Sequence, residues 1–255
     1  MEQLLPETLL FLIAAGFLAA FVDSVVGGGG LISMPALLLA GLPPGVVLGT
    51  NKLGGTASSL TSTVQFLRSG NIDRRLAFAL FPLSFLGSAL GTYTVTLLPS
   101  EFLKPLVVCL LIAVTIYTVF KKNWGAGAVY RGLTNAKRVL VAIAAFVIGY
   151  YDGFFGPGTG SFLLFAFLLL GFDFVRAAGN ARLLNFASNI ASLMTFLAFG
   201  LVNFVYGVPM ALAMIAGAWT GSRFAIKRGA AFVKPLFVSV TTLLIGKQLW
   251  DLLLG

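Results

Sequence analysis

The sequence predicts an all-α polytopic membrane protein made of two inverted-topology repeats, and three observations carry this prediction. Of the 255 residues, 58% are hydrophobic and only 10% are charged, whereas soluble domains carry about 25% charged residues. Apolar stretches of roughly 17–25 residues, long enough to cross the hydrocarbon core as helices, recur along the chain. Two glycine-rich breaks, each preceded by an aspartate, interrupt apolar segments about 130 residues apart.

The remaining composition narrows the class of function. The net charge is +9, and the basic residues lie mainly in short loops between apolar stretches. This pattern is typical of the cytoplasmic side of a membrane protein, so we expect no nucleic-acid partner. The lone Cys109 excludes a disulfide within the chain. The absence of histidine excludes Ser-His catalysis and histidine-ligated metal, and no phosphate-binding loop is present. We therefore expect no cofactor and no metal.

The predicted elements follow one order twice. In the first half, short apolar segments at 8–22 and 31–42 flank the first break, and fuller spans follow at 46–67, 76–98 and 102–120. In the second half, the equivalents are 139–151, 162–170, 175–199, 204–226 and 232–254. Each repeat is thus a hairpin of short helices plus three transmembrane helices, with residues 1–120 as the first repeat, 121–138 as a linker and 139–255 as the second repeat. All belong to a single membrane domain.

Matching residues support an internal duplication. At a shift of about 130 residues, the polar and glycine positions of the first half fall on similar residues in the second: Asp23, Gly27 and Gly29 on Asp152, Gly156 and Gly158, and Gly49, Lys52 and Leu53 on Gly179, Arg182 and Leu183.

Loop charges predict the orientation of the repeats. Lys and Arg are retained on the cytoplasmic side, which places the loop containing Arg68, Arg74 and Arg75 and the linker at 121–138 inside, and both termini outside. Corresponding loops then face opposite sides, as in inverted repeats of secondary transporters. The segments around each break enter and leave by the same face, either as re-entrant hairpins, which their brevity favours, or as two complete short crossings.

The glycine breaks are candidate binding elements. Backbone groups freed at membrane depth need partners, and helices that start at a break direct N–H groups and positive dipole ends inward. We expect backbone donors to an anion here, although the glycines could instead serve close helix packing. The candidate donors are Gly28, Gly29, Gly30, Gly158, Thr159 and Gly160.

Intramembrane charges supply the second set of candidates, because such charges are costly and usually functional. Lys52 and Arg182, with hydrogen-bonding neighbours, suit an oxyanion, or they could snorkel to an interface or neutralise Asp23 and Asp152. Those aspartates could carry protons in coupled transport or act as counter-ions or helix caps. The polar neighbours are Thr50, Asn51, Asn180, Asn185 and Asn189.

The first break and the segment after it resemble the sulfite exporter TauE/SafE family, also called TSUP transporters. The resemblance rests on Val22-Asp23-Ser24 through Gly30-Leu31-Ile32, Pro35, and Gly49-Thr50-Asn51-Lys52-Leu53, and it covers almost the whole chain, with a weaker echo in the second half. It implies a bacterial or archaeal inner-membrane permease for small sulfur-containing anions such as sulfite, thiosulfate or organosulfonates.

The leading hypothesis is therefore a secondary transporter that alternates access to a small anion held between the breaks. The alternatives are an anion channel on the same scaffold and, less favoured, an intramembrane aspartyl hydrolase that uses Asp23 and Asp152. The expected partners are the small anion and the lipid bilayer, and homo-oligomerisation stays open.

Overall fold

The computed structural model describes the backbone of residues 6–99, 101–103, 109, 132 and 134–254, and side chains no further than Gly229. Most of the predicted span at 102–120 and most of the linker at 121–138 lie outside these residues. The described part of the chain is helical and contains no strand, as predicted for a polytopic membrane protein. By length and composition, three of its helices could cross a membrane: Pro6–Val26, Arg74–Thr96 and Phe204–Gly229.

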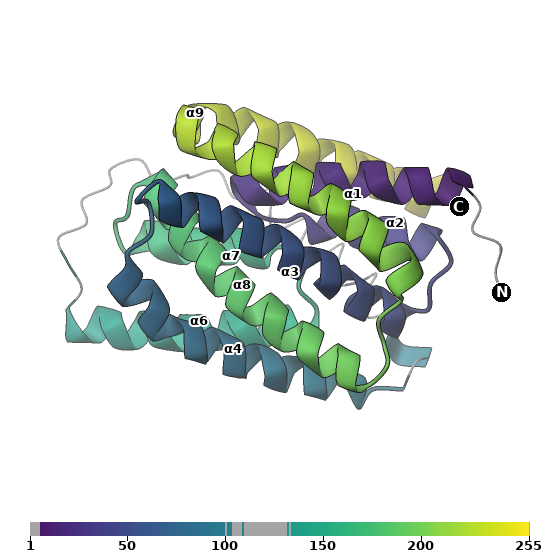
Figure 1. Ribbon diagram of the computed structural model, residues 1–255, viewed down its shortest axis with the longest axis horizontal. Coiled ribbons are helices and arrows are strands. Elements are labelled where there is room, and N and C mark those ends of the chain that lie inside the picture. Colours follow the sequence, from purple (N-terminus) through teal and green to yellow (C-terminus); the bar gives the residue numbers. More distant parts are fainter. Residues whose placement is uncertain (1–5, 100, 104–108, 110–131, 133, 255) are drawn as a thin grey trace.

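The helices follow the predicted order, with the short ones after each break (Figure 1). The first half contains α1 (Pro6–Val26), α2 (Gly30–Leu39), α3 (Pro44–Arg68) and α4 (Arg74–Thr96). The second contains α6 (Asn135–Phe154), α7 (Thr159–Leu169), α8 (Phe174–Ala198) and α9 (Phe204–Leu254). Within α9 the backbone leaves the helical region at Gly229, with φ 58° and ψ −155°, so α9 consists of two helical segments that meet at a kink.

The first arm of each hairpin extends beyond the predicted segment at both ends. Helix α1 begins at Pro6 rather than at residue 8, and α6 begins at Asn135, within the predicted linker at 121–138. Both helices also continue through their aspartates, Asp23 and Asp152, for about one more turn. Each carboxylate has a cationic partner, described below, so the charge does not end the helix. Only the second arms are short, with 10 residues in α2 and 11 in α7.

The two hairpins open toward opposite ends of the molecule (Figure 1). Helix α1 begins and α2 ends at one end, whereas α6 begins and α7 ends at the other. Helix α1 packs against α9, and α4 packs against α6, while α3 and α8 contact each other and lie between these outer pairs. Carboxylates in the preceding loops cap α4 and α8: Asp73 Oδ1 accepts the backbone N–H of Leu76, and Asp173 Oδ1 accepts that of Arg176.

Glycines set the close approach of the outer helix pairs. A side chain at Gly87 or Gly91 of α4 would collide with backbone carbonyls of α6, and one at Gly217 or Gly221 of α9 would collide with those of α1. Small residues that let backbones approach are typical of helix packing in membranes. The repeated spacing of these four glycines therefore has a packing explanation.

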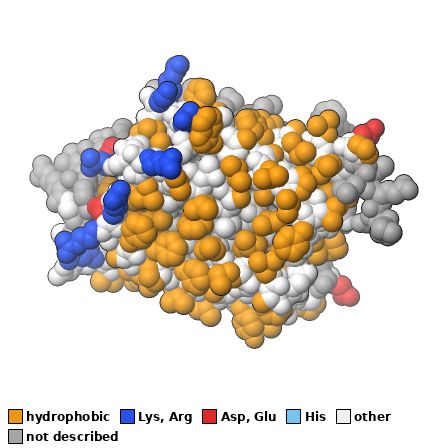
Figure 2. Space-filling view, viewed as in Figure 1, with side chains coloured by type: hydrophobic (Ala, Val, Ile, Leu, Met, Phe, Trp, Pro, Cys, Tyr) orange, Lys and Arg blue, Asp and Glu red, His pale blue; other side chains and the backbone are white. Residues whose placement is uncertain are grey.

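Two apolar clusters lie toward opposite ends of the helix bundle, and each encloses one of the short helices. One includes Met34 and Leu37 of α2, and the other includes Leu163 and Phe167 of α7. Between them, buried polar residues gather where the breaks meet. On the face shown in Figure 2, apolar side chains cover the middle of the molecule, and the described Lys and Arg side chains gather at one end, where α3 ends and α4 begins (Figure 1).

Candidate functional site

The two glycine breaks touch each other in the interior. A side chain at Gly27 would collide with the backbone of Gly160 and Ser161, and Gly27 has φ 87°, which disfavours any residue with a Cβ. The Ser161 hydroxyl donates to the carbonyl of Val26 at 3.0 Å. A side chain at Gly30 would meet Pro157 at 3.0 Å. The breaks thus form one continuous centre rather than two separate ones.

Two buried ion pairs cross this centre, and each joins one half of the chain to the other. Lys52 Nζ of α3 lies 2.9 Å from Asp152 Oδ1 of α6, and the two side chains are 2% and 3% exposed. Arg182 Nη1 of α8 lies 2.6 Å from Asp23 Oδ2 of α1. The Asp23 side chain is more accessible, at 16%. Lys52 and Arg182 are thus neutralised by aspartates in this conformation, which was one of the alternatives considered for these intramembrane cations.

Asp23 also caps the short helix that follows its own break. Its Oδ1 accepts the backbone N–H of Gly29, the residue that precedes α2, at 3.0 Å. Asp152 differs, since its Oδ2 is buried and has no hydrogen-bond partner. One carboxylate is therefore fully engaged, whereas the other keeps an oxygen whose hydrogen-bonding capacity is unused.

A polar cavity of about 40 Å³ lies between the breaks, roughly three times the space that one water molecule needs. The cavity is lined by residues in and next to the two breaks, by residues of α3, α6 and α8, and by one side chain of α9. Of the predicted site residues, it brings together Asp23, Gly29, Gly30, Asn51, Lys52, Asp152, Gly158, Thr159, Gly160 and Asn185, and Asn189 lines it as well.

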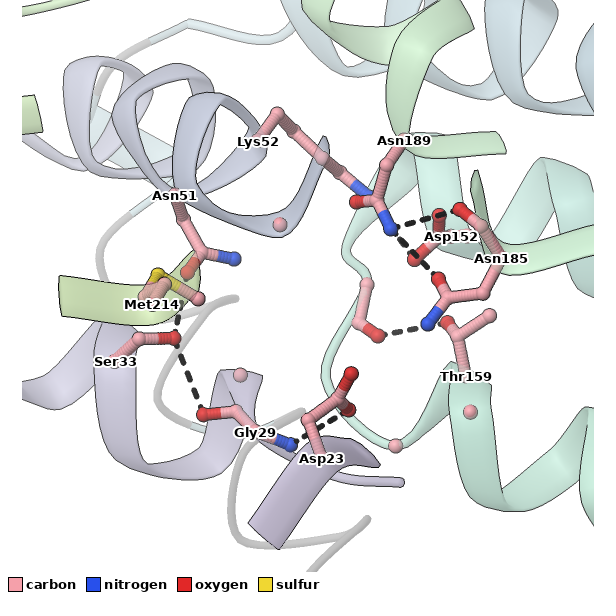
Figure 3. A pocket seen from close by; sticks show the side chains of 15 residues that line it. Asp23, Gly29, Ser33, Asn51, Lys52, Asp152, Thr159, Asn185, Asn189 and Met214 are labelled. Atoms are coloured by element: carbon pink, nitrogen blue, oxygen red, sulfur yellow. Dashed lines mark hydrogen bonds and ion pairs between the residues drawn. The ribbon is translucent and has the colours of Figure 1, made fainter. Parts of the chain in front are cut away.

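Side-chain amides line two sides of the cavity (Figure 3). On one side, Asn51 Oδ1 accepts from the Ser33 hydroxyl at 2.6 Å, which leaves the Asn51 amide nitrogen directed into the cavity. On the other side, Asn189 Nδ2 donates to the side-chain and backbone oxygens of Asn185 at 2.7 and 2.8 Å. The Lys52 ammonium lines the same cavity, and together these groups make a compact polar lining.

Some of the predicted backbone donors already have acceptors. The N–H of Gly29 donates to Asp23, and that of Thr159 donates to the carbonyl of Gly156 at 3.1 Å. Gly30 and Gly160 lie in the first turns of α2 and α7, where N–H groups have no acceptor within the helix. These two glycines are the better placed donors.

Four predicted residues lie outside the cavity lining. Gly28 is one, and Arg182 is another, since it contacts Asp23 instead. Thr50 accepts the backbone N–H of Asn203, and Asn180 accepts that of Asp73, both at 2.9 Å. Each of these last two side chains thus ties a central helix to a loop of the other half.

Sequence reasoning missed four lining residues: Ser33, Gly55, Gly156 and Met214. Helical spacing could have found the first two, because Ser33 lies one turn after Gly30 and Gly55 lies one turn after Asn51. Gly156 lies within the second break and stands beside the Lys52 ammonium. Met214 of α9 carries no signal in the sequence. Among the described residues, no three Asp, Glu, Cys or His side chains come together.

Comparison with known proteins assigns the family. The sulfite exporter TauE/SafE family matches residues 12–247. The chain belongs to this family. It is 39% identical to a probable membrane transporter protein ORF9 of Sinorhizobium over 98% of this chain and 96% of that protein. It is 36% identical to a probable membrane transporter protein of Haemophilus influenzae over 96% of each chain, and 35% identical to YfcA of Escherichia coli over 96% of this chain and 91% of YfcA. No solved structure matches.

Membership of the TauE/SafE family makes the protein a membrane transporter rather than an enzyme, which confirms the expected class. The geometry agrees. A catalytic aspartate dyad needs two carboxylates that share a proton, whereas Asp23 and Asp152 each contact a separate cation. The hydrolase alternative is therefore dropped.

Proposed function

We propose that this TauE/SafE protein is a secondary transporter that binds a small sulfur-containing anion in the cavity between the breaks. The observation that carries the proposal is the position of Lys52, whose buried ammonium lines a polar cavity between two broken helices. Sulfite, thiosulfate and organosulfonates each present several acceptor oxygens to the surrounding donors. Gly30, Gly160 and Asn51 supply such donors beside the lysine.

The ion pairs suggest how binding is coupled to exchange. Because two aspartates balance Lys52 and Arg182, an anion that enters the cavity must compete with a carboxylate for its cation. Protonation of Asp152 would release the Lys52 charge to the anion, and loss of that proton would restore the pair and expel the anion. In this scheme Asp152 couples proton binding to anion binding. Asp23, which also caps α2, has mainly a structural role.

Inverted topology provides the means of alternating access. We propose that residues 1–120 and 139–255 are inverted repeats on either side of a cytoplasmic linker, in the cytoplasmic membrane, with both termini outside. The opposite openings of the hairpins support this arrangement, as do the matched contacts of Thr50 with Asn203 and Asn180 with Asp73. The gathering of basic side chains at one end supports the orientation.

The test is uptake of labelled sulfite or thiosulfate into proteoliposomes that contain the wild type, Lys52→Ala or Arg182→Ala. We expect saturable uptake with counterflow in the wild type, at least a tenfold loss in Lys52→Ala and a smaller loss in Arg182→Ala. Lys137→Ala, which removes an exposed cation outside the cavity, is the matched control. Unchanged uptake in both cavity variants would remove their proposed roles. Conductance without saturation or counterflow would favour the anion channel instead.

A further inference from the structure

A groove of about 550 Å³ lies away from the transport cavity, between α3 and α9. It lies at the end of the molecule where the basic side chains gather. We call it the cationic groove and define it by Leu60, Val64, Arg68, Trp219, Arg223 and Lys227. It has no part in the proposed transport mechanism.

The groove is polar at one end and apolar at the other. Along α3, Leu60 precedes Arg68 by two turns, about 12 Å of helix. Along α9, the exposed ring of Trp219 precedes Arg223 and Lys227 by one and two turns. Since both helices run toward the same end (Figure 1), the basic groups lie together at that end of the groove, and the apolar groups lie along the helices toward the middle of the molecule.

The cations of the groove have no carboxylate partner within the described part of the chain. None of the ion pairs found there involves Arg68, Arg223 or Lys227. The Arg223 guanidinium instead stacks 3.8 Å from the centre of the Trp219 ring, which holds it in place without neutralising it. Gln65 joins α3 to α9 in the groove, because its side-chain amide donates to Trp219 O and Ser222 Oγ, both at 2.7 Å. The site is thus built and positively charged.

We propose that the cationic groove binds one anionic phospholipid of the surrounding bilayer, with its phosphate among Arg68, Arg223 and Lys227 and an acyl chain along Leu60 and Val64. Basic pockets between transmembrane helices on the cytoplasmic side suit such headgroups. The volume fits a ligand of several hundred Å³, far more than an inorganic phosphate. A symmetric contact with a second copy would bring two of these positively charged grooves together, which charge repulsion opposes.

The test is native mass spectrometry of the full chain, delipidated and then offered phosphatidylglycerol or phosphatidylcholine with identical acyl chains. The groove variant is Arg68→Gln/Arg223→Gln/Lys227→Gln, and each single variant is measured too. The matched control is Arg74→Gln/Arg75→Gln/Arg138→Gln, which removes the same charge from exposed positions outside the groove. Melting of each protein in phosphatidylcholine micelles, with and without added phosphatidylglycerol, provides a second reading.

We expect the wild type and the control to prefer phosphatidylglycerol and to be stabilised by it. In the groove variants the preference should fall about fivefold for each cation removed, the factor expected for one basic residue at an anionic surface. Equal losses in the control and the groove variant would show a general surface effect and overturn the proposal. So would displacement of the lipid by inorganic phosphate, or a dimer mass that the groove variant alone abolishes.

Discussion

Replacing Asp152 by Asn tests the central ion pair. The substitution keeps the shape of the side chain and removes only its charge, so the Lys52 ammonium, 2% exposed, stays buried without a counter-ion. Removing one partner of a buried pair costs about 3–5 kcal/mol. At about 2–4 °C for each kcal/mol in a chain of this size, the melting temperature should fall by about 6–20 °C.

A double-mutant cycle isolates the pair. Lys52→Met alone leaves Asp152 unpaired, whereas Lys52→Met/Asp152→Asn leaves no buried charge at this position. The double variant should therefore be about 3 kcal/mol more stable than the sum of the single effects predicts. The readout is thermal or denaturant unfolding of purified protein in one detergent. Additivity of the two single effects within about 0.5 kcal/mol would refute the view that these side chains are energetically coupled.

The same variants connect stability to anion binding. In Asp152→Asn the Lys52 charge is free for an anion, so sulfite or thiosulfate should restore part of the lost stability, by about 2.7 kcal/mol at a concentration 100 times its Kd. Lys52→Met/Asp152→Asn should not respond. Equal responses in both proteins would place the anion away from Lys52, while the stability result for the ion pair would stand.

Two further substitutions test the packing of the site. Gly27→Ala should lower the melting temperature more than Gly41→Ala, because both glycines have positive φ but only Gly27 lies against the backbone of Ser161. Gly41→Ala should carry the conformational cost alone, about 1–2 kcal/mol, and equal losses would contradict the close approach of the breaks. Thr50→Val should cost about 1–3 kcal/mol by leaving the N–H of Asn203 without its acceptor, with the KM for transport unchanged. A raised KM in a protein of normal stability would make Thr50 a ligand instead.

The sequence was sufficient for the helical class and for the order of the described helices, because both rest on local properties. Apolar length marks the spans, and glycine or proline ends them. It was less reliable where a polar residue lies inside a helix. The apolar pattern ends the first segment before Asp23, yet α1 continues to Val26, because Arg182, 159 residues later in the chain, neutralises that carboxylate.

The candidate site was only partly predictable for the same reason. That Lys52 must find a partner follows from the cost of an intramembrane charge, but which carboxylate it meets depends on how the halves pack. The hydropathy of the chain does not distinguish a pair within one half from a pair between halves. Met214 shows the limit most clearly, because it lines the cavity from α9 and resembles any other apolar residue of that helix.

The crossing of the ion pairs restricts how this transporter can move. A rocking motion of one half against the other would pull Lys52 away from Asp152 and Arg182 away from Asp23, since each pair joins the halves. Leaving either charge buried and unpaired costs several kcal/mol, so an empty site should resist the motion. An anion that takes the place of the carboxylate beside Lys52 removes that cost for this pair when Asp152 takes up a proton, and only the Arg182–Asp23 pair then opposes the motion. Bound substrate would then permit the conformational change that the empty carrier resists, which is the condition for exchange rather than leak.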